Sequence, residues 1–496
     1  MSWQSFIVPG AGTPGRTGDD LALARVESTD RVVVAVGLAV VAGAALARPV
    51  PAMVLGAAAV LVIRRRASAI RWAVALGLIA SWNGARHVAS LVPPERAPLH
   101  AWVRLVDEPQ RFGAGVSVAA QTPVGTVLLG GWGGTARSLT RFHTGEYLLV
   151  DAEVRPLRPD ERGRWRSAGV VGRAEVDVIL DHADGSPLDR STLRVRRALT
   201  AGSAVLGDDR QALFLGMVIG DDQNQPEATR DRFRRVGLSH LTAVSGQNVA
   251  FVLAVASPLL RRLRPTPRWV ATLGLIGWFA ALTRFEPSVL RAASMSALAA
   301  TTFWRGWHAS GVRLLAVAVG GFLLISPLLV TSVGWWMSVG ATAGIVLGAG
   351  PITERLPGPR PVAAAVGVTL AAQLGVTPIS FAVFGTAALW SPLTNALAVP
   401  VAGWVMVWGI PAGLLAGLVP ATAPVVHLPS SAGLAWVDTV ARLADRAEPG
   451  WPPGLVVTLQ VAVVALAMVW TRRIRRARPA GQVGSLLDVG PPAHRR

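Results

Sequence analysis

The chain has 496 residues, of which 51% are hydrophobic and only 16% are charged, and its mean hydropathy is +0.45. A soluble protein of this length does not need so much apolar surface, so this class is excluded and we expect an integral membrane protein. All 48 basic residues are arginines against 29 acidic residues, and the absence of cysteine excludes disulfides and thiolate metal sites. The net charge of +19 suits an anionic partner such as nucleic acid or lipid head groups, although arginines also serve simply to orient membrane proteins.

The N-terminal part of the chain predicts a short tail followed by membrane helices. Residues 1–30 are polar and lack the pattern of a secretory signal, so we expect a cytoplasmic tail. The segment 31–92 should hold N-terminal transmembrane helices, in three short uncharged runs near or below the roughly 17 residues that span a bilayer. Arg64, Arg65 and Arg66 precede the third run and indicate a cytoplasmic loop, which sends that run outward.

Residues 97–185 have the alternating pattern of β-strands. Five short runs, separated by glycine, proline and charged turns, predict a small barrel of OB type outside the cytoplasmic membrane. Such barrels bind single strands through basic grooves and stacking aromatic rings. A solvated basic loop would have the same composition. The candidate DNA-binding residues of this domain and its linker are Arg155, Arg158, Arg164, Trp165 and Arg166.

The next segment, 186–235, is rich in arginine and is predicted to be an interfacial linker. Within it, "QALFLGMVIGDD" predicts an amphipathic helix that is too short to span the bilayer and lies at its surface.

Residues 236–472 are predicted to form the membrane core, and 473–496 a basic cytoplasmic tail. The simplest division of the apolar runs gives eight crossings, whereas an outside barrel and an inside C-terminus require an odd number. One run should therefore be broken or re-entrant. The best candidate is "GTAALWSPLTNALAVPVAG", which Pro392, Asn395 and Pro400 interrupt. Broken backbone at this depth is tolerated only inside protein or along a water-filled cavity.

Polar residues are concentrated at the start of the first core helix, in "SHLTAVSGQNVAFVLAV". Thr242, Ser245 and Asn248 follow each other at intervals of three, which places them on one helical face, and Gly246 permits close helix approach or a local break. This face is either polar contact between helices or the lining of a conduit.

Two further polar residues lie deep in apolar sequence. Arg291 is in "EPSVLRAASM", and a charge at that depth is costly and usually faces a cavity or a partner. A salt bridge with Glu286 or a position at the helix end is the alternative. Gln373 lies in the middle of a long apolar run.

Four stretches resemble, in this order and spacing, the signatures of the ComEC family of competence channels: "FRRVGLSHLTAVSGQNV", "EPSVLRAASM", "SVGWWMS" and "AAQLGVTPISFAVFGTAALWSPLTNALAVP". Family members pass single-stranded DNA through the bacterial cytoplasmic membrane. The resemblance reaches from about residue 32 to 471 and implies a polytopic α-helical membrane protein with an inserted small all-β (OB-like) extracytoplasmic domain. The expected residues of the DNA path are His240, Thr242, Ser245, Gly246, Gln247, Asn248, Arg291, Trp336, Gln373 and Asn395.

Three departures from the family pattern limit what the resemblance implies. Ser-Gly-Leu-His-Val of the family is here 245–249 with Asn248 in place of histidine, so hydrogen bonding survives but protonation does not. Gly-Phe-Gln-Leu-Ser becomes 334–338 with Trp336 at the third position. Only 25 residues follow Thr471, so we expect a form without the family's metallo-β-lactamase-like domain, with no enzymatic activity, no cofactor and no metal site.

The resemblance implies single-stranded DNA and membrane lipids as partners. A DNA receptor, a cytoplasmic DNA translocase, a separate nuclease and a homo-oligomeric assembly are compatible with the same function. Two other functions stay open: a transporter of a small anionic solute or lipid with Arg291 as counter-charge, and a membrane-embedded hydrolase using Ser245 and His240. The hydrolase is disfavoured because these two residues are five apart, off one helical face, and no acidic residue is nearby to orient the histidine.

Overall fold

The structure is a computed structural model that describes residues 19–47, 69–92, 94–242, 246–307, 309–356, 358–384, 390–448, 450–452, 454–456 and 458. The predicted spans over 49–63 and 449–471, the triplet Arg64 to Arg66 and the tail 473–496 lie outside the described residues, wholly or in most of their length.

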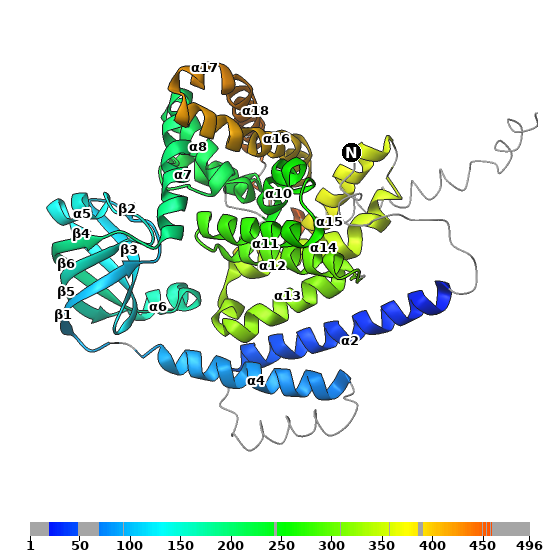
Figure 1. The fold of residues 1–496 in the computed structure, drawn as a ribbon, viewed down its shortest axis with the longest axis horizontal. Coiled ribbons are helices and arrows are strands. Elements are labelled where there is room, and N and C mark those ends of the chain that lie inside the picture. Colours follow the sequence, from blue (N-terminus) through cyan, green and yellow to red (C-terminus); the bar gives the residue numbers. More distant parts are fainter. Residues whose placement is uncertain are drawn as a thin grey trace, which may run out of the picture.

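The first two helices pack side by side. They are α2 (Asp19–Leu46) and α4 (Ala69–Ser90), and α2 also packs against α13 (Gly311–Ile325) of the core (Figure 1). Gly43 and Gly77 allow the close approach, because a Cβ at either position would meet backbone of the opposite helix. The predicted tail and span are joined here, since α2 runs without interruption across residue 30.

The following domain contains six strands: β1 (Ala97–Leu105), β2 (Gln110–Phe112), β3 (Gly115–Thr122), β4 (Gly125–Trp132), β5 (Tyr147–Pro156) and β6 (Val170–Ala183). The order is β1-β5-β6-β4-β3-β2, with an additional pairing between β1 and β3 that closes five of the strands into a ring. Only β4 and β6 are parallel. The five predicted strands are all present and β2 was not predicted; the OB-type identity of this barrel stays a prediction.

Alternation of buried and exposed residues along the strands produces the core of the barrel. In β5, Leu148, Val150, Ala152 and Val154 are buried while the residues between them face outward. Helix α5 (Gly133–Leu139) contacts β3, β4 and β6. A second short helix, α6 (Pro159–Trp165), and the 3-10 turn η1 (Arg166–Ala168) connect β5 to β6.

Helices make up the rest of the described chain. They are α7 (Pro187–Ser203), α8 (Asp208–Ile219), α9 (Glu227–Arg235), α10 (Gly246–Leu260), α11 (Pro265–Leu282), α12 (Pro287–Trp304), α13 (Gly311–Ile325), α14 (Val333–Thr353), α15 (Arg360–Phe384), α16 (Ser391–Leu418), α17 (Ala423–Val426) and α18 (Leu428–Ala447). The 3-10 turns η2 (Ala204–Leu206), η3 (Ser239–Leu241), η4 (Pro327–Thr331) and η5 (Pro420–Thr422) join them.

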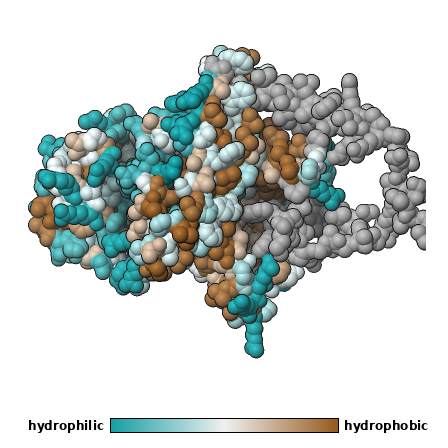
Figure 2. All heavy atoms as spheres, turned by 90° about the horizontal axis from the view of Figure 1, so that it is seen from above, coloured by the Kyte–Doolittle hydropathy of each residue, from teal (hydrophilic) through white to brown (hydrophobic). Residues whose placement is uncertain are grey.

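Four segments of the described chain are long and apolar enough to cross a membrane: Ser239–Leu260, Val333–Thr353, Val362–Val383 and Ser391–Leu418. Helix α13 is a shorter apolar helix. The predicted spans in α11 and α12 are not in this set, since both helices carry serine, threonine or arginine residues. Figure 2 shows hydrophilic residues predominating over the barrel, and hydrophobic residues gathered in patches over the helices. The chain is a multi-pass membrane protein.

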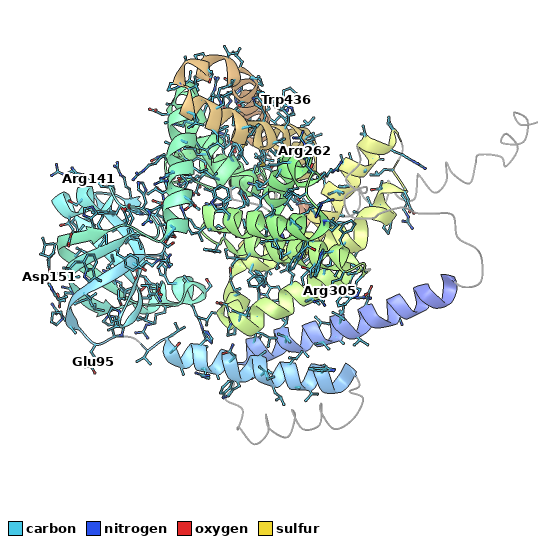
Figure 3. All side chains as sticks on the ribbon, viewed as in Figure 1. Glu95, Arg141, Asp151, Arg262, Arg305 and Trp436 are labelled. Carbon is cyan, nitrogen blue, oxygen red and sulfur yellow. The ribbon has the colours of Figure 1, made fainter. Side chains whose placement is uncertain are left out.

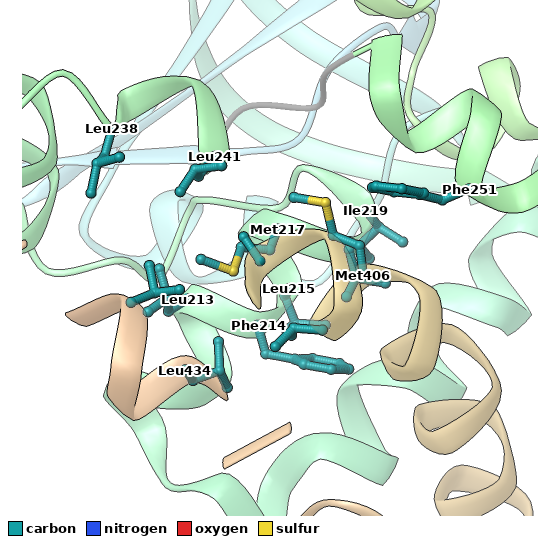
Figure 4. Close-up of a cluster of buried hydrophobic side chains, with 14 of the residues drawn as sticks. Leu213, Phe214, Leu215, Met217, Ile219, Leu238, Leu241, Phe251, Met406 and Leu434 are labelled. Atoms are coloured by element: carbon teal, nitrogen blue, oxygen red, sulfur yellow. The ribbon is translucent and has the colours of Figure 1, made fainter. Parts of the chain in front are cut away.

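The prediction of an amphipathic interfacial helix is wrong for α8. Every residue from Ala212 to Ile219 is buried, so the helix has no polar face along this length. Its side chains point in several directions, and Phe214, Leu215 and Met217 meet residues such as Met406 and Leu434 from α16 and α18 (Figure 4). A helix that is hydrophobic all round belongs in the interior. Helix α8 is therefore a central element of the helical core.

The prediction of a break at Asn395 and Pro400 is also wrong. Helix α16 is continuous from Ser391 to Leu418. Pro392 lies in its first turn, where the missing backbone N–H would have had no intrahelical partner. Pro400 and Pro411 lie inside the helix, as membrane helices tolerate when neighbouring groups satisfy the freed carbonyls. Residues 385–389, the first part of the same stretch, lie outside the described residues.

Glycines allow close packing of α14 against α15 in the core. Gly340, Gly344 and Gly348 recur every four residues on α14, and they face Ala371 and Gly375 on α15. A Cβ at Gly344 would collide with the carbonyl oxygen of Ala371, and one at Gly375 with that of Gly340. Small residues at such spacing let helix backbones meet, which is how helices gain packing energy in a membrane.

Candidate functional site

The starts of α10, α12 and α14 meet around Arg291. A Cβ at Gly246 would lie 2.9 Å from Nη2 of Arg291 and 2.8 Å from Cβ of Ala292, so only glycine fits there without displacing the guanidinium. Arg291 Nε donates to the Ser338 hydroxyl at 2.9 Å, and Nη1 approaches the sulfur of Met295 at 3.6 Å. Three helices thus place a glycine, an arginine and a serine together; we call this the Arg291 site.

Arg291 carries its charge in the protein interior, with only 6% of the residue exposed. The predicted alternative of a salt bridge with Glu286 is not found, and the ion pairs of the described residues do not include Arg291 at all. A hydroxyl and a thioether leave most of the guanidinium's five donors available. Such a group can bind an anion, because its planar fork matches phosphate and carboxylate oxygens.

The other polar residues near the start of α10 are not part of the Arg291 site. Asn248 is 2% exposed and donates through Nδ2 to the Met217 carbonyl at 3.0 Å, which ties α10 to the end of α8. Thr242 donates to the Ser239 carbonyl at 3.1 Å within its own turn. His240 and Gln247 are exposed. Ser245 lies outside the described residues. The hydrogen bond of Asn248 is a polar contact between helices, which is one of the two interpretations of this polar face; the other was the lining of a conduit.

A second polar cluster joins α15 to α16. The Ser391 hydroxyl donates to Oε1 of Gln373 at 3.3 Å and accepts from Nδ2 of Asn395 at 3.1 Å. Thr394 donates to the Val236 carbonyl at 3.0 Å. Two predicted path residues, Gln373 and Asn395, therefore share one hydroxyl, and their role in a path stays a prediction.

The remaining predicted residues are distributed over two regions. Trp336 is partly buried and donates to the Val330 carbonyl at 2.7 Å. On the barrel, Arg155 pairs with Glu153 at 2.7 Å and with Glu175 at 3.5 Å, so its charge is largely neutralised. Arg158 and Arg166 are exposed, the Arg164 side chain is outside the described set, and Trp165 packs against the small cluster of Leu128, Leu157 and Val170.

Sequence reasoning missed an ion network that joins the barrel to the core. Arg284, between α11 and α12, lies 3.6 Å from Asp107 and 3.4 Å from Glu108 of the barrel, and 3.5 Å from Asp221. Arg196 of α7 pairs with Asp221 at 2.7 Å and donates to the Leu282 carbonyl at 2.9 Å. We call these five side chains the barrel–core network. It could not be read from sequence, because its members come from four separate segments.

The local backbone and electrostatics of the network are unusual. Arg284 and the next residue, Phe285, have φ values of 59° and 54°, a conformation that costs on the order of 1 kcal/mol or more for a residue with a side chain. Burial raises the pKa of Glu108, but the hydrogen bond with His143 at 3.1 Å and the charges of Arg284 and Arg196 outweigh it and lower the pKa to about 2. The carboxylate is therefore ionised at neutral pH. Among the described residues, no group of three or more His, Cys, Asp or Glu side chains is arranged to hold a metal ion.

Comparison with known proteins identifies the family. The family model described as "Competence protein" matches residues 217–474. Competence protein ComA of Neisseria gonorrhoeae is 30% identical over 295 residues, which cover 55% of this chain and 41% of ComA. Uncharacterized protein YcaI of Escherichia coli K12 is 30% identical over 219 residues (40% and 28%), and ComE operon protein 3 of Bacillus subtilis is 25% identical over 219 residues (43% and 27%).

The matched part of the chain contains the Arg291 site, both ends of α10 and α12, and the cluster around Ser391. The alignments span less than half the length of these three relatives. No solved structure matches the chain. Because the family model covers just over half of the 496 residues, including the helices that build the Arg291 site, this chain belongs to the competence protein family.

Proposed function

We propose that this chain forms a conduit that carries single-stranded DNA across the bacterial cytoplasmic membrane during natural transformation. The names of two relatives, Competence protein ComA and ComE operon protein 3, support a role in DNA uptake. The observation that carries the proposal is the Arg291 site, a buried guanidinium without a carboxylate partner among the described residues, at the meeting point of three helices. An arginine in this setting attracts a passing phosphate backbone.

The site suits transient contact with a polymer. Ser338 holds Nε of Arg291, and Nη1 meets the sulfur of Met295. Gly246 keeps the adjacent helix close without covering Nη2 with a side chain. A strand must be able to leave each contact, so conduction requires binding that is favourable but weak. One arginine with a neutral hydroxyl partner meets this requirement better than a dense cluster of charges.

The orientation of the conduit follows from the distribution of arginine. Asp107 and Glu108 of the barrel meet Arg284 next to the start of α12, so the barrel lies at the end where α10, α12 and α14 begin. The opposite ends of these helices carry Arg261, Arg262, Arg305 and Arg355 on or beside them. By the positive-inside rule the arginine-rich end is cytoplasmic, and the barrel is outside.

A conduit role does not require catalysis by this chain, and we propose that it has none. Neither cysteine nor a clustered set of metal-ligating side chains in the described residues supports a metal-dependent nuclease. Purified chain incubated with labelled single-stranded DNA and Mg²⁺ or Mn²⁺ should leave the DNA intact. Degradation that copurifies with the chain and is abolished by a chelator would contradict this.

The conduit role is tested by deleting the gene and measuring both uptake of labelled linear DNA and transformation frequency, with plasmid-borne wild-type chain as the control. Loss of both, restored by the plasmid, is the expected result. The transporter alternative predicts normal transformation and altered accumulation of a small anion, and that outcome would refute the conduit.

A further inference from the structure

The ends of α10, α11 and α12 that lie away from the barrel carry arginines and tryptophans without acidic residues. Arg262 and Arg264 are on the connection from α10 to α11, and Arg305 caps α12. All three are exposed. The sequence contains no Asp or Glu between 246 and 285, nor between 287 and 353. We call Arg262, Arg264 and Arg305, with Trp304 and Trp307, the arginine–tryptophan end.

The arginines of this end differ from those of the barrel in their electrostatics. On the barrel, Arg96 pairs with Glu153 and Arg173 pairs with Glu161 at 2.7 Å. None of Arg262, Arg264 and Arg305 takes part in an ion pair within the described ranges. Unneutralised arginines attract phosphates far more strongly than paired ones.

The tryptophans of this end are held in place with part of their rings exposed. Trp304 stacks on Trp269 with centroids 4.6 Å apart and planes inclined by 14°, and its Nε1 approaches the Thr266 hydroxyl at 3.4 Å. Trp307 is 60% exposed, and the Arg305 guanidinium lies 4.9 Å from its ring centroid. Flat rings beside cations are the surface on which single-stranded bases stack.

The same helices carry the Arg291 site at their other end. Arg291 and Arg305 both belong to the α12 region, and a rise of about 1.5 Å per residue separates them by about 20 Å along the axis. Helix α10 likewise begins at Gly246, against Arg291, and ends beside Arg262. A strand that passes Arg291 and follows these helices therefore arrives at the arginine–tryptophan end.

We propose that the arginine–tryptophan end binds single-stranded DNA as it leaves the conduit on the cytoplasmic side. This inference rests on the proposed function and adds the place and chemistry of the exit: arginines hold phosphates, and the exposed tryptophan rings stack bases. Figure 3 shows Arg262 and Arg305 at separate places on this end, away from Arg141 and Asp151 of the barrel. A ligand that engages both arginines must be extended. A DNA strand carries a phosphate at every nucleotide, whereas a lipid head group is compact.

The test uses the full chain in nanodiscs of phosphatidylcholine alone, where no anionic lipid competes, and a fluorescent oligothymidylate as the probe. The variant replaces Arg262, Arg264 and Arg305 with glutamine. The matched control replaces Arg96, Arg173 and Arg234, which are exposed, ion-paired and equal in charge. Loss of three phosphate contacts should weaken binding by on the order of tenfold or more and reduce the slope of log affinity against log salt by about 2. The control should bind like the wild type.

Base stacking is tested separately at Trp307. Trp307→Leu should weaken binding, and Trp307→Phe should restore part of it, because phenylalanine keeps a flat ring without the indole N–H. A purely structural role of Trp307 would instead lower the yield of both variants alike.

Each remaining outcome overturns a specific statement. If the wild type binds the oligonucleotide and the Arg262, Arg264 and Arg305 variant binds equally well, the exit assignment is wrong and the conduit proposal stands. A second measurement tests binding of the detergent-solubilised chain to vesicles with and without phosphatidylglycerol. If the variant loses affinity for the phosphatidylglycerol vesicles but not for the oligonucleotide, the surface binds lipid and the exit assignment is wrong. If the wild type binds no single-stranded DNA at all, the proposed function itself fails.

Discussion

Arg291 combines burial with a neutral hydrogen-bond partner, and this combination distinguishes it from the other buried arginine described above. Arg196 is equally shielded, but it pairs with Asp221. A buried arginine with a carboxylate partner can be explained by structure alone. Arg291, held by Ser338 and Met295, has no such compensation among the described side chains, so its charge is retained for another reason.

Arg291→Gln should therefore impair transport more than stability. Glutamine keeps polar atoms for the contact with Ser338 but removes the charge that attracts phosphate. We expect membrane abundance close to wild type and a decrease in DNA uptake on the order of tenfold, as loss of a charged contact of about 1.4 kcal/mol would give. Arg442→Gln, which removes an exposed arginine paired with Asp438, is the control. Uptake that falls only in proportion to abundance would indicate a structural role.

Ser338→Cys tests whether water reaches the Arg291 site. The chain has no native cysteine, so a single thiol can be followed without background. The adjacent guanidinium favours the thiolate, and we expect fast reaction with an anionic water-soluble thiol reagent, slowed when Arg291→Gln is added. Leu347→Cys lies on the same helix, where Leu347 is 67% exposed. On a helix long and apolar enough to cross the membrane, we expect this position to face lipid and to stay unreactive in a bilayer. If neither cysteine reacts with the reagent, water does not reach Ser338 and the Arg291 site does not line an aqueous path.

The close packing of α14 against α15 affects where α14 places Ser338. Their glycines bring the backbones together, and Ser338 lies just before the first of them on α14. The position of the serine relative to Arg291 therefore depends on how closely α14 can approach its neighbour.

Gly344→Ala should loosen this pair, because the new methyl group would overlap the Ala371 carbonyl. Overpacking of this kind costs about 1 to 3 kcal/mol, which should lower the midpoint of thermal unfolding in detergent. Gly350→Ala is the matched control on α14, since a Cβ there meets nothing within 4 Å and alanine favours a helix by up to about 1 kcal/mol. If Gly344→Ala is as stable as the control, the close packing of α14 and α15 does not contribute to the stability of the chain.

Sequence pattern was informative where an element is determined by its own residues. The five main strands were predictable because alternating side chains reveal a buried and an exposed face within each strand. Helix α8 was not, since its shortness suggested an amphipathic helix at the membrane surface, while its burial depends on α16 and α18, far along the chain. The break predicted in α16 was wrong because Pro392 lies in the first turn, where proline does not interrupt a helix, and because the helix stays continuous through Pro400.

The candidate site was predictable only in part for the same reason. Arg291 is conspicuous in an apolar stretch, but nothing local indicates Ser338 as its partner, because the contact needs α12 and α14 to begin at the same end of the core. Arg284 gave no signal either. Arg284 joins the barrel to the core through three carboxylates on two other segments. Its left-handed backbone conformation could not be predicted either, because the residue is not a glycine.

An ion network joins the barrel to the helical core, and this makes their association sensitive to acid. The pKa of Glu108 is lowered from 4.5 to about 2 in the folded chain, so its stabilising contribution is complete above pH 4.5 and is lost as the pH falls through about 2.

Glu108→Gln should therefore destabilise the chain at neutral pH by up to roughly 3 kcal/mol, and this difference from wild type should disappear between about pH 4.5 and pH 2. Unfolding in detergent across this pH range measures it. Glu175→Gln, which removes an exposed partner of Arg155, should have little effect at any pH. A Glu108→Gln protein whose deficit persists unchanged at pH 2 would show that packing, not ionisation, is the cause.

The contacts of Arg284 also set a condition on the order in which the chain assembles. The barrel precedes the turn between α11 and α12, and N-terminal domains generally fold first during synthesis. Asp107 and Glu108 are thus in place before Arg284 is made, and the turn is anchored only against a barrel that has already folded. A chain whose barrel misfolds lacks this anchor at the start of the helix that carries Arg291. A correctly folded barrel is then the condition on which completion of the Arg291 site depends.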